Sequence, residues 1–192
     1  MTVTPHTRLS LLLRLRDAAD HDAWQQFVEL YAPLVYRFAR QRGLQDADAA
    51  DLTQNVLLAV ARSWQQVPYD PARGKFRTWL FTVARNKLNT FLTQSRRLSE
   101  RVQPLADNDV PQPEEMAQWE QEYQQQLFHW AAEQVKGQFQ SSTWLAFWAT
   151  SVENRSPAAV AEQLGISTGA VYIARSRVLA RLREAVQQIE EE

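Results

Sequence analysis

Apolar residues recur at intervals of three or four along nearly the whole chain, which is the spacing that gathers side chains on one face of a helix. One such stripe contains Trp24, Phe27, Val28 and Tyr31, and it continues beyond Pro33, a residue that predicts a kink or a new helix start. Alternating β-branched runs closed by hairpin turns are almost absent. The sequence therefore predicts an all-α fold.

The pattern changes at residues 98–113, LSERVQPLADNDVPQP, which show no helical period and contain three prolines. Such a stretch is typical of a linker. We therefore expect two small helical domains, 8–97 and 114–192, joined by an acidic, proline-containing linker at 98–113. A stripe of aromatic and apolar residues in the helix after the linker is expected to face a core or another helix.

Charge is unevenly distributed, because residues 1–97 carry 14 Lys and Arg against 8 Asp and Glu, whereas residues 98–140 carry 2 against 8. The basic block is suited to nucleic acid, although ordinary surface charge explains it equally well. There is no cysteine, which excludes disulfides and thiolate metal sites and fits a reducing cytosol. No secretory signal or membrane span is expected.

The segment VAEQLGISTGAVYIARSRVLARLRE, residues 160–184, predicts a short helix, a turn and a longer basic helix. Ser156 and Ser167 are suited to cap the two helices, and Gly165 to make the turn. The order of small and apolar residues is that of a helix-turn-helix, although a generic helical hairpin is an alternative. In a DNA reader, the residues expected to reach bases or phosphates are Ser167, Thr168, Tyr172, Arg175, Ser176 and Arg177.

Two further motifs lie in the first half: DAADLTQNVLLAV from residue 48 and GKFRTWLFTVARNKL from residue 74. Together with the helix-turn-helix, in this order, they resemble bacterial RNA polymerase sigma factors of the extracytoplasmic-function group. The resemblance covers roughly residues 8–97 and 115–188. It implies a region 2 domain that docks on polymerase and melts the minus-ten element, and a region 4 domain that reads the minus-thirty-five element.

The resemblance implies core RNA polymerase and promoter DNA as partners, with an anti-sigma factor as a further one that the sequence does not identify. It assigns polymerase docking to Asp48, Asp51, Leu52, Gln54 and Asn55. Asn55 departs from the family, which usually has an acid there. It also implies a cytoplasmic protein.

For the minus-ten element, a flipped base must be held by stacking and by hydrogen bonds to its edge. The residues that match the family's reader, together with basic neighbours that are suited to hold phosphates, are Arg73, Lys75, Phe76, Arg77, Trp79, Arg85, Asn86 and Lys87. Trp79 can equally be a core residue, in which case the loop at 69–77 would carry specificity. In the second domain, Tyr172 and Ile173 stand where the family often has polar or basic residues, so the protein either reads an unusual element or relies on apolar contacts to thymine methyls.

No catalytic constellation is visible: the three histidines have no paired-ligand spacing, and no glycine-rich phosphate loop is present. We expect no enzyme activity, no cofactor and no metal. The leading prediction is a transcription initiation factor. The alternatives are a helix-turn-helix DNA-binding regulator or adaptor without promoter-melting activity, and a protein-interaction module that docks through residues 114–135.

Overall fold

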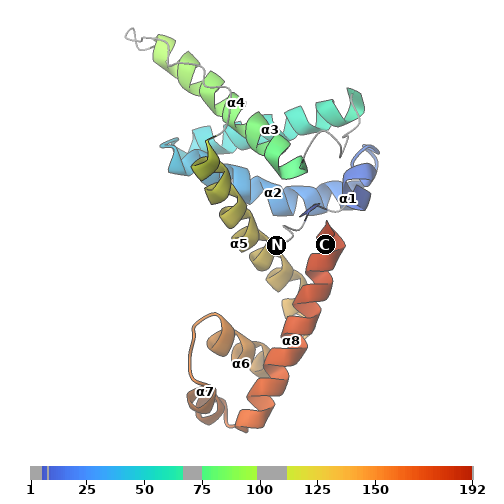
Figure 1. Cartoon of the computed structure of the whole chain (residues 1–192), viewed down its shortest axis with the longest axis vertical. Coiled ribbons are helices and arrows are strands. Elements are labelled where there is room, and N and C mark those ends of the chain that lie inside the picture. The colour runs from blue at the N-terminus through green and yellow to red at the C-terminus, as the bar shows by residue number, and fades with distance from the viewer. Residues whose placement is uncertain (1–5, 8, 67–74, 99–111, 192) are drawn as a thin grey trace. The chain divides into compact units, whose positions relative to one another are not determined.

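The computed structural model describes residues 6–7, 9–66, 75–98 and 112–191 (Figure 1). Within them the elements are β1 (His6–Thr7), α1 (Leu9–Arg14), α2 (His21–Gln41), α3 (Asp46–Gln66), α4 (Phe76–Leu98), α5 (Pro113–Lys136), α6 (Ser141–Ser151), α7 (Pro157–Leu164), α8 (Thr168–Ile189) and β2 (Glu190–Glu191). The predicted all-α class is confirmed, since the strands have two residues each.

The chain forms two compact units, Met1–Gln126 with Glu191–Glu192 and Leu127–Glu190. In the first unit, α3 packs against both α2 and α4. The core of α2 follows the predicted stripe, with Phe27 and Tyr31 fully buried. Val28 was predicted in the same stripe but is 39% exposed, because it lies one residue outside the face that contacts α3 and α4.

Pro33 neither ends α2 nor starts a new helix, since α2 is one helix from His21 to Gln41. A proline inside a helix cannot donate to the carbonyl four residues earlier, here that of Glu29. The buried side chain of Gln126, from α5, donates to this Glu29 carbonyl at 3.3 Å. Gln126 also accepts a hydrogen bond from Arg37 Nη1 at 2.9 Å. A side chain from a distant part of the sequence thus replaces the hydrogen bond that proline removes.

The first half of α5 belongs to the core of the first unit. Trp119 is 1% exposed and meets the rings of Phe38 and Phe81 at centroid distances of 5.5 and 5.4 Å. Tyr123 is fully buried and stacks on Tyr31 at 5.7 Å. These contacts bury two large aromatic rings, each of which contributes substantial hydrophobic free energy. The boundary between the compact units falls between Gln126 and Leu127, inside α5, whereas the second domain was predicted to begin at residue 114.

The second unit contains α6, α7 and α8, which contact one another pairwise (Figure 1). Its core gathers small and β-branched side chains, which let the helices approach closely: Ala146, Ala149, Val160, Ala161, Val171 and Ala174. Leu164 and the turn residue Ile166 pack against this cluster. This cluster of small and apolar side chains agrees with the helix-turn-helix order of residues in the sequence.

Candidate functional site

The predicted polymerase-docking residues divide between the surface and the core of α3. Asp51, Gln54 and Asn55 are exposed, and Asp48 is half-buried. Leu52, in contrast, is 2% exposed, so it holds α3 in place and its side chain is not available to a partner. The exposed residues are spaced by three and four, as a single outer face of a helix requires. Hence four of the five predicted residues can contact the same partner on one face of α3.

Leu58 extends this face and was not among the predicted residues. It is 46% exposed and follows Asp51 by seven residues, two helical turns along the same side. The same periodicity that identified the core could have identified it, since it falls out of phase with the buried positions Val56 and Val60. Leu58 therefore adds apolar area to this polar face.

Two predicted minus-ten residues have structural roles in α4. Phe76 is 3% exposed and contacts the rings of Tyr31 and Trp64, each at 5.4 Å. Its side chain therefore belongs to the core and cannot itself meet a base. Trp79 is half-buried, and its ring centroid lies 5.6 Å from that of Trp64. At least part of its ring therefore packs in the core, as the alternative prediction for this tryptophan stated.

Arg77 was predicted to hold a phosphate but is buried, at 3% exposure, against α5. It donates to both carboxylate oxygens of Glu120, at 2.6 and 3.1 Å, and its guanidinium lies 4.3 Å from the centre of the Tyr123 ring. Burial by itself lowers the pKa of Arg77, but Tyr123 and the Glu120 carboxylate raise it above its ordinary value. Arg77 therefore remains charged and is satisfied inside the chain.

Glu115 engages a second predicted phosphate ligand. Its carboxylate lies 3.5 Å from Arg85 Nε and 3.2 Å from Arg42 Nη2. Arg42 in turn lies over the Phe38 ring at 3.8 Å. Sequence reasoning missed Arg42 and the two glutamates because no local pattern links α5 to helices that precede it by dozens of residues.

The predicted minus-ten residues that remain at the surface of α4 are polar. Lys75, Asn86 and Lys87 are all exposed. Asn86 carries a carboxamide, which both donates and accepts hydrogen bonds. Arg73 lies outside the described residues, as does most of the loop 69–77 that was the second choice for specificity. The exposed part of the predicted set thus consists of one carboxamide and two cationic side chains.

The helix-turn-helix has the local geometry that its sequence predicted. The Ser156 hydroxyl accepts from the Ala159 N–H at 3.2 Å, and the Ser167 hydroxyl accepts from the Ala170 N–H at 3.1 Å. Gly165 has a φ of 64°, the left-handed conformation that glycine tolerates best.

All six residues predicted to reach DNA are exposed, at the N-cap or in the first half of α8: Ser167, Thr168, Tyr172, Arg175, Ser176 and Arg177. One side of this helix is buried through Val171, Ala174 and Val178. Tyr172 and Ser176 lie on the outer face opposite this buried side, and Arg175 and Arg177 lie on the two flanks of the outer face. The predicted set left out Ile173, which is 55% exposed on this outer face.

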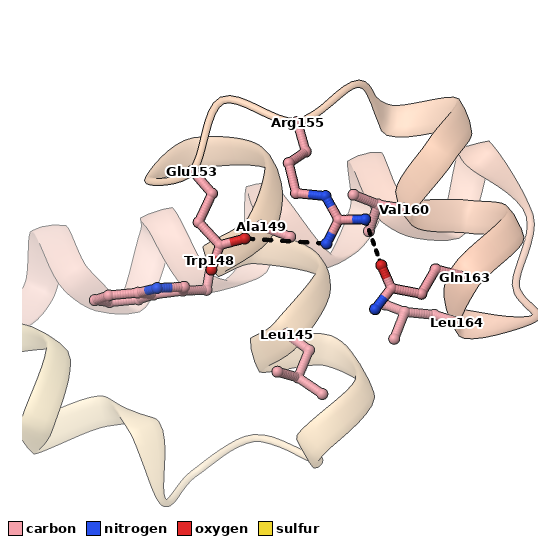
Figure 2. A pocket seen from close by; sticks show the side chains of 8 residues that line it. All are labelled: Leu145, Trp148, Ala149, Glu153, Arg155, Val160, Gln163 and Leu164. Carbon is pink, nitrogen blue, oxygen red and sulfur yellow. Dashed lines mark hydrogen bonds and ion pairs between the residues drawn. The ribbon is translucent and has the colours of Figure 1, made fainter.

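A pocket of about 200 Å³ lies between α6 and α7 (Figure 2). Arg155 bridges its rim, with Glu153 on one side at 4.0 Å and the Gln163 carboxamide on the other. The pocket is lined by Leu145, Trp148, Ala149, Glu153, Arg155, Val160, Gln163 and Leu164. It offers no nucleophile with an adjacent base. Across the described residues, no three His, Cys, Asp or Glu side chains gather as metal ligands.

No helix in the described part of the chain is long and apolar enough to cross a membrane. In both units, the candidate sites are exposed faces of helices that display charged, amide and apolar side chains.

Part of the first unit is similar to a known protein family. Residues 27–98 match the family model of Sigma-70 region 2. The ECF RNA polymerase sigma factor RpoE of Cereibacter sphaeroides is 28% identical over 109 residues, which are 56% of this chain and 51% of that protein. The ECF RNA polymerase sigma factor SigE of Mycolicibacterium smegmatis is 37% identical over 81 residues, 42% of this chain and 29% of that protein.

The alignments thus span about half of the first relative and less than a third of the second. A solved structure, described as CnrH in complex with the cytosolic domain of CnrY, covers 93% of this chain and 96% of its own, with 19% identity and a TM-score of 0.36. Residues 27–98 are therefore similar to Sigma-70 region 2, and part of the chain is similar to two RNA polymerase sigma factors of the extracytoplasmic-function group.

Proposed function

We propose that this protein is a transcription initiation factor that binds core RNA polymerase, directs it to specific promoters and helps to melt the minus-ten element. One observation carries the proposal: a chain whose residues 27–98 match Sigma-70 region 2 also folds residues 157–189 into a helix-turn-helix with an exposed basic face. Such a factor works in the cytoplasm, where the polymerase is. An anti-sigma factor remains a predicted further partner.

Polymerase docking is proposed for the outer face of α3. Asp51, Gln54 and Asn55 supply charge and hydrogen bonds there, and exposed Leu58 supplies apolar area. Charged and amide groups at the rim of an apolar anchor give an interface its orientation and partner choice. Asn55, in place of the family's usual acid, keeps a hydrogen-bonding side chain but removes one negative charge.

Minus-ten recognition is proposed for the exposed part of α4. Because Arg77 and Arg85 are engaged by Glu120 and Glu115, the cationic contacts to the DNA backbone are assigned, among the described residues of the predicted set, to Lys75 and Lys87. Asn86 then offers a donor and acceptors to the edge of an unpaired base. Trp79 contributes through its accessible face or through its support of the core.

Reconstituted transcription tests the proposal. We expect the purified chain, mixed with bacterial core polymerase, to start specific transcripts from a pool of genomic promoters, and their aligned start sites to reveal both promoter elements. Asn86→Ala should lose promoter opening, detected by permanganate reactivity of unpaired thymines, while polymerase binding is kept. Asn89→Ala is the matched control, since Asn89 is also an exposed asparagine on α4.

The second candidate function is a helix-turn-helix regulator that binds duplex DNA without melting it. It is favoured by the engagement of Arg77 and Arg85 inside the chain, which leaves fewer cations for single-stranded DNA. A chain that fails to bind core polymerase and starts no transcript, yet still binds duplex DNA through α8, would establish this second function and refute the first.

A further inference from the structure

Tyr172 and Ile173 form an exposed apolar pair on the recognition helix. Their exposures, 56% and 55%, are the highest of any large hydrophobic residue in the described part of the chain. Isolated exposed hydrophobic residues are common, but two adjacent ones on a face that is otherwise suited to ligand contact indicate a contact surface. These side chains lie between the buried positions Val171 and Ala174, so core packing does not account for them.

The position of the pair around the helix axis shows what the pair can touch. Successive residues of an α-helix are about 100° apart, so Gly169, Tyr172, Ile173 and Ser176 occupy the centre of the face opposite the buried side. Arg175 and Arg177 fall on the two flanks of this face, and both are exposed. A helix lying in a DNA groove would thus point arginines at the two phosphate backbones and the apolar pair at the base edges.

Internal packing does not explain why residue 169 is a glycine. It is not in a positive-φ conformation, and a methyl group added there would meet only the Ser167 hydroxyl, at an ordinary 3.8 Å. Alanine is the better helix former, so neither the backbone nor the packing of this chain requires glycine here. A glycine in that situation is explained by the close approach of something outside the chain.

The charge of α8 indicates which kind of molecule comes close to Gly169. Residues 168–180 contain two arginines, Arg175 and Arg177, and no acid, whereas Arg181 beyond them pairs with Glu184. A polyanion is therefore the matched partner, and a helix of this width fits the major groove of duplex DNA. In that groove the only apolar group on a base edge is the C5 methyl of thymine.

We propose that α8 reads thymines in a duplex promoter element through van der Waals contacts of Tyr172 and Ile173 with the C5 methyl groups, with Gly169 providing the space for the base edges. The inference rests on the proposed function, since it concerns the upstream element of the same promoters. The apolar pair supplies sequence preference, and the flanking arginines supply affinity that is independent of sequence.

Replacement of thymine by uracil, which lacks only this methyl group, tests the inference directly. Promoters recovered from the transcription experiment are synthesised with uracil at single positions of the upstream element. Binding of the chain with core polymerase is then measured by mobility shift. We expect binding to fall about fourfold for each contacted methyl, the equivalent of one buried methyl group. In Tyr172→Ala and Ile173→Ala, the preference for thymine over uracil should disappear at the position that each side chain contacts.

Gly169→Ala provides an independent test of the close approach at this residue. We expect this variant to bind the thymine promoter at least tenfold more weakly while its thermal unfolding midpoint is unchanged or raised. Gly137→Ala is the control at another open glycine of the same unit, and Leu145→Ala removes an equally exposed apolar side chain from α6. Both should bind as the unaltered chain does.

The outcomes separate the two proposals. Specific transcripts with equal binding of thymine and uracil promoters, or an unchanged preference in the alanine variants, would overturn the methyl contacts and leave the proposed function standing. Wild-type binding by Gly169→Ala would overturn the close approach. A chain that starts no transcript with core polymerase refutes the proposed function, and this inference with it.

Discussion

At the residue scale, the contact between Pro33 and α5 shows how one local defect is repaired by a distant side chain. The proline leaves the Glu29 carbonyl without its helical donor, and Gln126 supplies one at 3.3 Å. Buried carbonyls that lose their partner cost about 1–3 kcal/mol. Gln126 is itself buried, so its carboxamide also needs these partners.

A double-mutant cycle tests this repair. Gln126→Leu should lower the free energy of unfolding in urea by about 1–3 kcal/mol, because the Glu29 carbonyl and Arg37 both lose a partner. In a Pro33→Ala background, residue 33 again donates to Glu29, so the loss should be smaller by roughly 1 kcal/mol. Gln125→Leu, at an exposed neighbouring position, is the control. Strict additivity of the two changes would contradict the mechanism.

Asp20 joins α1 to α2 and makes this junction sensitive to acid. Its carboxylate accepts from Arg14 at 2.7 and 2.8 Å and caps α2 through the Ala23 N–H at 3.0 Å. The hydrogen bond from Arg14 first, and that from Ala23 second, lower the pKa of Asp20 below its ordinary 3.8. The stabilisation is therefore complete above pH 3.8 and is lost as the pH falls through the lower, folded-state pKa.

Asp20→Asn should flatten this part of the stability profile. The asparagine retains an oxygen that can cap α2, but it has no proton to bind and no charge for Arg14. We expect the variant to be less stable near neutral pH and to lose less stability as the pH falls below 3.8. Urea unfolding followed by circular dichroism at several pH values measures both effects. Asp22→Asn, an exposed acid in the first turn of α2, is the control, and an equally steep acid loss in Asp20→Asn would count against this role.

At the element scale, the sequence was most informative where structure depends on neighbouring residues. The caps Ser156 and Ser167 and the turn at Gly165 act within three residues of their positions, so their types and spacing predicted the helix-turn-helix. The division of α5 between two compact units was not predictable in this way. It depends on Trp119 and Tyr123 meeting Phe38 and Tyr31, and the stripe that contains them indicates only that they are buried.

Prediction of the candidate site from the sequence has the same limit. Periodicity placed Asp51, Gln54 and Asn55 on an outer face, because a single helix determines that arrangement. It could not show that Arg77 is covered, since the covering residue, Glu120, comes from another helix 43 residues later. From its residue type, Arg77 was predicted to bind a phosphate, whereas in the folded protein it binds the carboxylate of Glu120.

Truncation of Trp119 tests the assignment of the first half of α5. Trp119→Ala should destabilise by about 3–5 kcal/mol, as expected for a buried tryptophan. Hydrogen exchange should report this loss in α2 and α4, with little change in α6–α8. Trp130→Ala is the matched change on the same helix, and it should affect the second unit, where Trp130 is 6% exposed. Equal loss of protection in α6–α8 for Trp119→Ala would contradict the assignment.

At the scale of the whole molecule, two candidate faces lie on different compact units. The α3 face, in the first unit, presents acids and amides with one exposed leucine, whereas the α8 face, in the second unit, presents arginines around an apolar centre. Faces of such different chemistry are suited to different partners, a protein for the first and a polyanion for the second. The proposed function, in which the protein directs polymerase to DNA, requires two such surfaces that can be altered independently.

Separation-of-function variants test this independence. Asp51→Ala with Gln54→Ala should weaken binding to core polymerase at least tenfold while leaving the fold intact, because both side chains are exposed. Arg175→Ala with Arg177→Ala should leave polymerase binding unchanged. If both arginines contact phosphates, it should reduce the slope of log binding constant against log salt for the upstream promoter duplex by about 1.8, or 0.9 for each lost contact. Fluorescence anisotropy with labelled polymerase and labelled duplex measures the two affinities side by side, and circular dichroism verifies the fold. Loss of both affinities in either variant, with the fold preserved, would show that the two faces do not act separately.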